Sequence, residues 1–207
     1  MGGGSVRASF IEGAEPGPVP RPHSPECRVI WLTGLSGAGK STLAREVAGR
    51  LRASGCASVV LDGDDVRLAI ADTRVAHDRD SRLTNAMRIC RLARMISLQG
   101  VTVVVATMSM FHEVHQWNRD HQPNFFQVLL RVPLDVLRQR DARGLYSRAE
   151  QGEVGDVVGI HVPYEEPGSP DLVLTNDGPA TEIRRLADEI LQGLLVRAGS
   201  ARAAVRS

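Results

Sequence analysis

The stretch from Gly34 to Thr42 constrains this chain most, because its sequence GLSGAGKST fits the phosphate-binding loop pattern GxxxxGK[ST] at every specified position. Residues 29–32 before it form an apolar run, and residues 42–51 after it carry apolar side chains at helical spacing. In that strand–loop–helix order, backbone N–H groups converge on a phosphate at the N-terminus of the helix. The alternative, a glycine-rich turn without a ligand, leaves the complete match unexplained.

We therefore expect the loop to bind a nucleoside triphosphate. In loops of this pattern the lysine, here Lys40, reaches the β- and γ-phosphates and is a candidate catalytic residue, while the hydroxyl of Ser41 binds Mg²⁺. The residues expected to bind the nucleotide are Gly34, Ser36, Gly37, Ala38, Gly39, Lys40, Ser41, Thr42 and, farther along the chain, Arg140.

Apolar runs and helical patterns alternate along the chain, which predicts an α/β fold of the P-loop kinase type with a five-stranded parallel sheet and helices on both faces. The expected strands are 29–32, 58–61, 101–105, 125–130 and 172–174, and the expected helices are 42–51, 82–98, 134–142 and 181–195. Ligands of such sheets bind beyond the carboxyl ends of the strands. The loop, residues 62–65 and residues 107–109 should therefore surround one site.

The two ends of the chain differ in composition from its body. Residues 1–27 are rich in glycine and proline and are expected to form a disordered leader. A single kinase domain is expected over 28–196, followed by a disordered tail over 197–207. Within the domain, 140–166 has little periodicity and is predicted to be an irregular lid, whose arginines either neutralise a transferred phosphoryl group or form a solvated basic face.

Composition limits the partners that we expect. The formal net charge is +1, which does not favour nucleic acid or an anionic membrane, so ATP and a small anionic acceptor are the expected partners. No apolar run approaches the ~20 residues that a membrane-spanning helix needs. Cys27, Cys56 and Cys90 contain no CxxC pair and are read as free thiols, which favours a cytoplasmic location.

An acidic cluster follows the second expected strand, in the run Asp62-Gly63-Asp64-Asp65-Val66-Arg67. We predict that Asp64 is catalytic, orienting or deprotonating an acceptor hydroxyl, and that it binds Mg²⁺ together with Ser41. The alternative is a turn with an aspartate that caps the next helix, and for Asp65 this role stays open. The 101–105 strand ends in Ala106-Thr107 rather than in an aspartate, which weighs against a motor, transporter or GTPase.

These motifs together resemble the adenylyl-sulfate kinase family, which transfers the γ-phosphate of MgATP to the ribose 3′-hydroxyl of adenylyl sulfate. The similar stretches are 34–42, Leu61 to Asp64 with Arg67, Arg82 with Asn85, Ser109, the lid run 140–146, Gly152-Glu153, Gly159-Ile160 and Pro163-Tyr164-Glu165. The resemblance implies a homodimer and an acceptor site formed by Asp62, Arg67, His77, Arg82, Asn85, Ser109, Arg119, Arg148 and Val157.

The chain departs from that family where the acceptor's adenine is held. Family members resemble one another in placing two phenylalanines around the base, whereas this chain has His77 and Val157 at those positions. Stacking on an aromatic side chain is worth roughly 1–3 kcal/mol per base, so this difference favours another nucleotide or a phosphorylated metabolite as acceptor. The run from Phe111 to Arg119 resembles the branch that includes cytidine diphosphoramidate kinase.

Two acceptors therefore remain open, adenylyl sulfate and an altered nucleotide or metabolite. A third hypothesis, of a different class, is a nucleotide-binding regulator or remnant domain without catalysis. Loss of Lys40 or Asp64 would favour it, and both residues are present.

Overall fold

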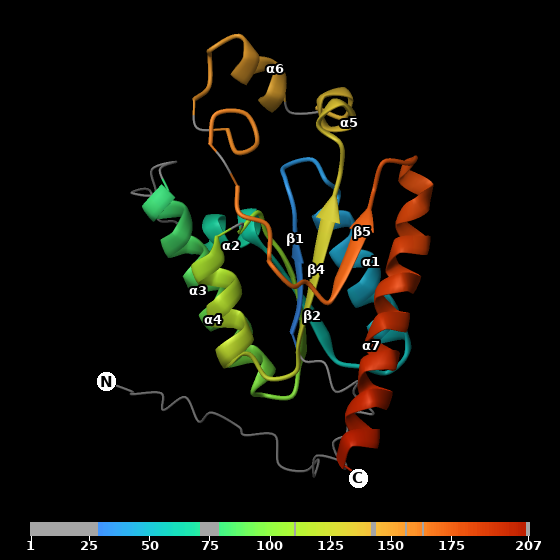
Figure 1. The fold of residues 1–207 in the computed structure, drawn as a ribbon. Coiled ribbons are helices and arrows are strands. Elements are labelled where there is room, and N and C mark those ends of the chain that lie inside the picture. The colour runs from blue at the N-terminus through green and yellow to red at the C-terminus, as the bar shows by residue number, and fades with distance from the viewer. Residues whose placement is uncertain are drawn as a thin grey trace, which may run out of the picture.

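The computed structural model describes residues 29–70, 79–109, 111–141, 144–155, 157–162 and 164–205, with side chains as far as Gly199. Five strands form one sheet in the order β2-β3-β1-β4-β5, and every neighbouring pair is parallel (Figure 1). The strands are β1 Val29–Thr33, β2 Ser58–Asp62, β3 Thr102–Ala106, β4 Phe125–Arg131 and β5 Leu172–Thr175. The predicted α/β fold with a five-stranded parallel sheet is confirmed.

Helices cover both faces of this sheet (Figure 1). The helices are α1 Lys40–Ala53, α2 Gly63–Ile70, α3 Arg79–Ser97, α4 His112–His121, α5 Leu134–Gln139, α6 Leu145–Glu150 and α7 Ile183–Val205, which follows a short 3₁₀ turn η1 Ala180–Glu182. Helices α1 and α7 pack on one face, and α2, α3 and α4 lie on the other. In the part of the chain that the structure describes, no helix is long and apolar enough to cross a bilayer.

The alternation of side chains along β1 explains why both faces are apolar. Ile30 and Leu32 belong to the core shared with α1 and α7, while Val29 and Trp31 belong to the core shared with α3 and α4. Successive side chains of a strand point to opposite faces, so a strand covered on both sides is apolar throughout. Because β1 is the central strand of the sheet, the loop that follows it opens at the middle of the carboxyl edge.

Three helices were not predicted, namely α2, α4 and α6. Each buries only a narrow stripe; α4, for example, buries Val114, His115 and Asn118. Two of those three side chains are polar, so the stripe leaves no apolar periodicity in the sequence. Helices of this kind are stabilised by packing against the rest of the molecule rather than by their own composition.

The C-terminal part differs from the expected tail. Helix α7 continues to Val205, past Arg197, where the disordered tail was expected to begin. The guanidinium of Arg197 pairs with Asp171 and lies 6.0 Å from the centroid of the Phe126 ring, and these contacts hold the helix against the sheet. The expected leader over 1–27 lies outside the described residues.

Candidate active site

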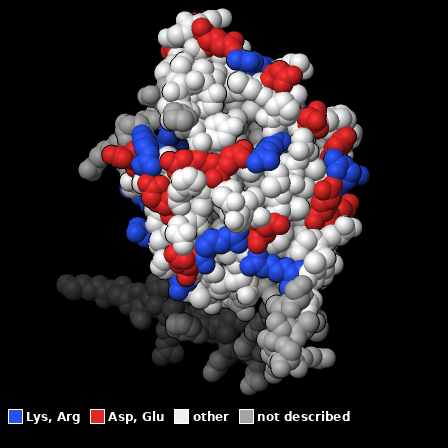
Figure 2. Space-filling view, in the orientation of Figure 1, with Lys and Arg blue, Asp and Glu red and all other residues white. Residues whose placement is uncertain are grey.

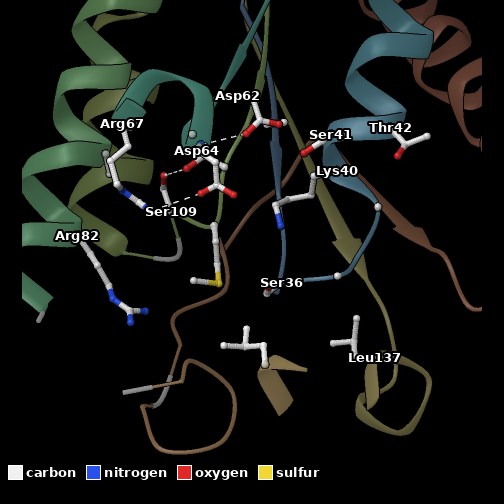
Figure 3. Close-up of a pocket in the computed structure, with 18 of the residues that line it drawn as sticks. Ser36, Lys40, Ser41, Thr42, Asp62, Asp64, Arg67, Arg82, Ser109 and Leu137 are labelled. Carbon is white, nitrogen blue, oxygen red and sulfur yellow. Dashed lines mark hydrogen bonds and ion pairs between the residues drawn. The ribbon is translucent and has the colours of Figure 1, made fainter. Parts of the chain in front are cut away.

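A cavity of about 400 Å³ opens at the carboxyl edge of the sheet, between the loop after β1 and the elements that follow β2 and β3 (Figure 3). It brings together most of the predicted site residues. Those that line it are Ser36, Gly37, Gly39, Lys40, Ser41, Thr42, Asp62, Asp64, Arg67, Arg82, Asn85, Ser109 and Arg140. Gly34 and Ala38 belong to the same loop but lie behind the cavity wall, where both are buried.

The glycines of the loop are required by close contacts as well as by backbone conformation. Gly39 has φ +92°, and a Cβ atom there would lie 2.7 Å from the Asn176 side-chain nitrogen. At Gly34, with φ +152°, a Cβ atom would lie 2.4 Å from the backbone oxygen of Leu130. A larger residue at either position would displace the loop from the strand or the turn behind it.

Lys40 is the first residue of α1, and its Nζ atom donates a hydrogen bond to the Leu35 carbonyl oxygen at 2.7 Å. Burial lowers the pKa of Lys40 to about 8, although the carboxylates of Asp62 and Asp64 oppose this by favouring the charged form. A phosphate at the loop would favour the charged form further. Lys40 is therefore placed to bind an anion and to gain a proton as it does so.

Two side chains that the sequence analysis did not predict as ligands fix the loop from behind, and Arg140, which was predicted to bind the nucleotide, contacts the segment that carries one of them. The buried Asn176 amide donates to the Ala38 carbonyl at 2.9 Å, and the Tyr146 hydroxyl donates to the Ser36 carbonyl at 2.8 Å. Arg140 donates to the carbonyls of Asn176, at 2.7 Å, and of Gly178. Asn176 directly follows β5, so the rule that ligands gather at the carboxyl ends of strands is the signal that could have found it.

The acidic cluster lies across the cavity from the loop (Figure 3). An Asp62 carboxylate oxygen accepts the backbone N–H of Asp64 at 3.0 Å, at the beginning of α2. The capping aspartate is therefore Asp62, and Asp65, for which this role stayed open, lies inside the helix instead. Asp64 is exposed and pairs with Arg67 at 3.4 Å, which places one carboxylate and one guanidinium together at the cavity wall.

Ser109 is held in the wall by two contacts. Its hydroxyl lies 2.9 Å from the Thr107 hydroxyl, and its carbonyl accepts a hydrogen bond from the Thr33 hydroxyl at 3.3 Å. Phe111, which was not predicted as a site residue, also lines the cavity. Phe111 lines the cavity together with Ser109 and the α3 residues Arg82 and Asn85, and Figure 3 shows Arg82 across the cavity from the phosphate-binding loop.

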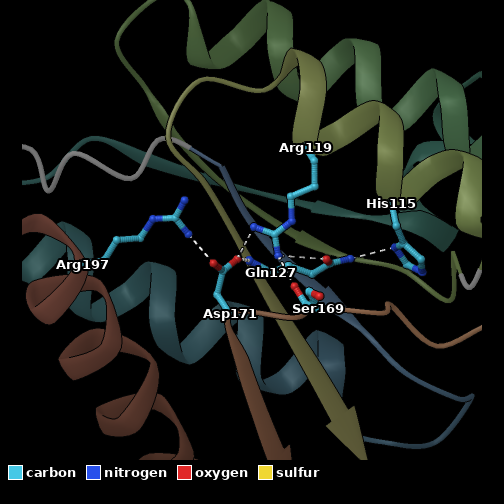
Figure 4. A network of polar contacts seen from close by, with 6 residues as sticks. All are labelled: His115, Arg119, Gln127, Ser169, Asp171 and Arg197. Carbon is cyan, nitrogen blue, oxygen red and sulfur yellow. Dashed lines mark hydrogen bonds and ion pairs between the residues drawn. The ribbon is translucent and has the colours of Figure 1, made fainter. Parts of the chain in front are cut away.

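Arg119 is not part of this cavity, which differs from its predicted role in acceptor binding. It pairs with Asp171 at 2.7 Å and donates to the Ser169 carbonyl at 2.7 Å and the Gln127 side chain at 3.3 Å (Figure 4). Asp171 accepts the backbone N–H of Gln127 at 2.7 Å and pairs with Arg197. These contacts tie α4 and α7 to the start of β5, so the geometry indicates a structural role for Arg119.

Three further predicted acceptor residues are not placed in the cavity. Arg148 on α6 is exposed and pairs with Glu153 at 3.5 Å. Val157 is 4% exposed and packs in the core cluster that includes lid residues, so its side chain does not face the cavity. His77 lies outside the described residues.

The residues at the cavity fit the predicted magnesium ion. Ser41, Asp62 and Asp64 offer only oxygen atoms, which is the ligand type that Mg²⁺ prefers. Among the described residues no group of three or more His, Cys, Asp or Glu side chains is arranged to hold a metal. Mg²⁺ bound to a nucleotide needs only one or two protein ligands, because phosphates and water supply the others.

This fold and this cavity define a P-loop kinase, a class in which the loop after the central strand faces carboxylates and arginines across one site. The family model described as "Adenylylsulphate kinase" matches residues 26–175, and the chain belongs to this family. It is therefore a kinase, from a family that uses ATP.

Individual relatives are similar over most of their length. An adenylyl-sulfate kinase of Chloroflexus aurantiacus is 42% identical over 149 residues, which cover 72% of this chain and 80% of that protein. A cytidine diphosphoramidate kinase of Campylobacter jejuni is 34% identical over 148 residues, which cover 72% of this chain and 85% of that protein. The solved structure of the Mycobacterium tuberculosis APS kinase CysC in complex with AMPPNP and APS has a TM-score of 0.74 and 33% identity, covering 83% of this chain and 99% of that one.

Proposed function

We propose that this kinase transfers the γ-phosphate of MgATP to a hydroxyl group of a small anionic nucleotide. One observation carries the proposal: the loop residues Lys40 and Ser41 face Asp64 across a single cavity whose far side is lined by Arg67 and Arg82. The loop binds the donor phosphates, and the arginines bind an anion on the acceptor. The hydroxyl to be phosphorylated then lies between them, beside Asp64.

Each residue has a defined task in this proposal. Asp64 accepts a hydrogen bond from the acceptor hydroxyl and takes its proton as the oxygen attacks the γ-phosphorus. Lys40 neutralises charge on the β- and γ-phosphates. Bound Mg²⁺ would be held by Ser41 and Asp64 and would stabilise the charge of the transferred group.

The charge and donors of the cavity favour an anionic acceptor. Arg67 keeps its Nε atom buried without a hydrogen-bond acceptor among the described residues, so the guanidinium retains a donor for a ligand. Guanidinium groups bind phosphate, sulfate and phosphoramidate alike through paired hydrogen bonds. The guanidinium groups therefore recognise the anionic group of the acceptor, but they do not select the nucleotide that carries it.

Two acceptors follow from the named relatives. Adenylyl sulfate is the first, since the CysC structure contains APS and the Chloroflexus relative is an adenylyl-sulfate kinase. A cytidine nucleotide is the second, since the Campylobacter relative is a cytidine diphosphoramidate kinase. The proposal includes a cytoplasmic location, with which the free cysteines Cys56 and Cys90 are consistent. Both are buried.

A coupled assay of ADP release, with adenylyl sulfate and a panel of cytidine nucleotides as acceptors, tests the proposal. Product masses should show one added phosphoryl group, and Asp64→Asn should slow the reaction at least about a hundredfold. Efficient turnover of adenylyl sulfate, with kcat/KM of about 10⁴ M⁻¹s⁻¹ or more, would exclude the altered acceptor. ADP release at background with every acceptor would instead favour a nucleotide-binding regulator.

A further inference from the structure

The acceptor side of the cavity is formed by segments that are far apart in the sequence. Phe111 immediately precedes α4 and lines the cavity, α3 begins at Arg79, and the segment that contains Glu165 leads from the lid to β5. These three segments meet on one face of the molecule, where acidic and basic side chains are interspersed (Figure 2). The position of Phe111 therefore depends on how the three segments are joined.

Glu165 makes the contacts that join them. One of its carboxylate oxygens accepts the backbone N–H of His112, the first residue of α4, at 2.6 Å. The other lies 3.9 Å from the Arg79 guanidinium, and the Glu165 carbonyl lies 3.4 Å from the Nε2 atom of His115. A carboxylate at this position satisfies a helix N–H group and interacts favourably with the helix dipole.

Arg79 transmits this connection to the aromatic ring. Its guanidinium carbon lies 5.3 Å from the centroid of the Phe111 ring, a distance at which a cation is attracted to the ring face. The same guanidinium donates to Glu113 at 2.9 Å. Arg79 thus connects two carboxylates to the residue that borders the acceptor side of the cavity.

We propose that Glu165 is a positioning residue for acceptor binding, which places the Phe111 ring at the cavity by capping α4 and holding Arg79. The inference rests on the proposed function, because it takes the acceptor to be a nucleotide. It assigns Phe111 as the aromatic surface against which the base of that nucleotide packs. Tyr146, the other aromatic side chain at the cavity, is engaged with the phosphate-binding loop through Ser36. Glu165 does not touch the cavity and acts through Phe111.

The chain offers a matched control in the next residue. Glu166 carries the same charge one position along, but it pairs with Arg131 at 2.6 Å, at the end of β4. Glu165→Ala removes both the cap and the ion pair, whereas Glu165→Gln keeps an oxygen that can accept the His112 N–H. Glu166→Gln removes an ion pair of similar exposure without affecting α4.

Steady-state kinetics with the acceptor that the wild-type protein uses best, from adenylyl sulfate and the cytidine panel, tests the proposal. We expect Glu165→Ala to raise the acceptor KM about three- to tenfold, since caps and exposed ion pairs have effects of this size. Glu165→Gln should recover part of the loss, and kcat and the KM for ATP should stay within twofold. Glu166→Gln should match the wild type. An equal rise of the acceptor KM in Glu165→Ala and in Glu166→Gln would overturn the proposal.

A double variant tests whether Glu165 acts through the ring. Phe111→Leu should itself raise the acceptor KM, and adding Glu165→Ala to it should change the KM by less than twofold. Multiplying effects, as for independent residues, would show that Glu165 does not act on Phe111.

Hydrogen exchange separates failure of this inference from failure of the proposed function, because it needs no acceptor. The amides of the first turn of α4 should exchange faster in Glu165→Ala than in the wild type. In Glu166→Gln their exchange rates should equal those of the wild type. Faster exchange without turnover of any acceptor would refute the proposed function while the connection through Glu165 stands. Unchanged exchange in Glu165→Ala would refute the connection itself.

Discussion

The lowered pKa of Lys40 has a consequence for ATP binding that can be measured directly. With a pKa of about 8, Lys40 is about nine-tenths protonated at pH 7 and about one-tenth protonated at pH 9. Binding of the phosphates needs the charged form of Lys40. The Kd for a non-hydrolysable MgATP analogue should therefore rise about tenfold between these pH values. A phosphate group with a second pKa of about 6 is ionised throughout this pH range, so the ligand does not contribute to the change in Kd.

The composition of the chain makes the pKa itself accessible, because Lys40 is the only lysine among the 207 residues. Reductive methylation with ¹³C-formaldehyde labels this side chain and the α-amino group alone, and an NMR titration then follows both. Calorimetry in buffers of different ionisation enthalpy should show uptake of about half a proton on binding at pH 8. In Lys40→Arg the Kd should not depend on pH, because a guanidinium stays charged. A Lys40 pKa near 10.5 or a Kd that stays constant to pH 9 would refute the reasoning.

Three further predictions concern single side chains. Asp64→Asn should lower kcat about 10²- to 10⁴-fold with the fold retained by circular dichroism, and a kcat near the wild-type value would exclude Asp64 as the base. Gly39→Ala should weaken ATP binding about tenfold or more by titration, because the new Cβ meets Asn176, while Gly55→Ala, at φ +82° with open space, should leave binding unchanged. Arg119→Ala should lower the free energy of unfolding in urea by about 1–3 kcal/mol without changing the acceptor KM, and a raised acceptor KM would restore the predicted role in acceptor binding.

Much of the fold follows from local patterns in the sequence. The strands from 101–105 and 125–130 were recognisable because a strand covered on both faces is apolar along its whole length. Helix α4 was not predicted, because its buried stripe is mostly polar. His115 interacts with Gln127 at 2.7 Å, and burial lowers the pKa of His115. A pattern of apolar residues cannot identify a helix whose inner side is satisfied by hydrogen bonds.

Fewer of the predicted acceptor residues than of the predicted loop residues line the cavity. Asp62, Arg67, Arg82 and Asn85 do line the cavity, but Arg119 and Val157, assigned by resemblance, lie elsewhere. Resemblance gives a position in a motif, whereas the direction of a side chain depends on what surrounds it. Arg119 turns toward Asp171, and that pairing could not be read from two residues so far apart in the sequence.

The loop from Gly34 to Thr42 was determined by the sequence alone, because the conformation that binds phosphate depends on glycines and a helix start that are neighbours in the chain. Tertiary structure decided what surrounds that loop. The amide of Asn176 behind Ala38, the Tyr146 hydroxyl on Ser36 and the Glu165 carboxylate on α4 all connect residues separated by 50 or more positions. Such contacts form only when the parallel sheet brings the carboxyl ends of its strands to one edge, and no local pattern encodes them.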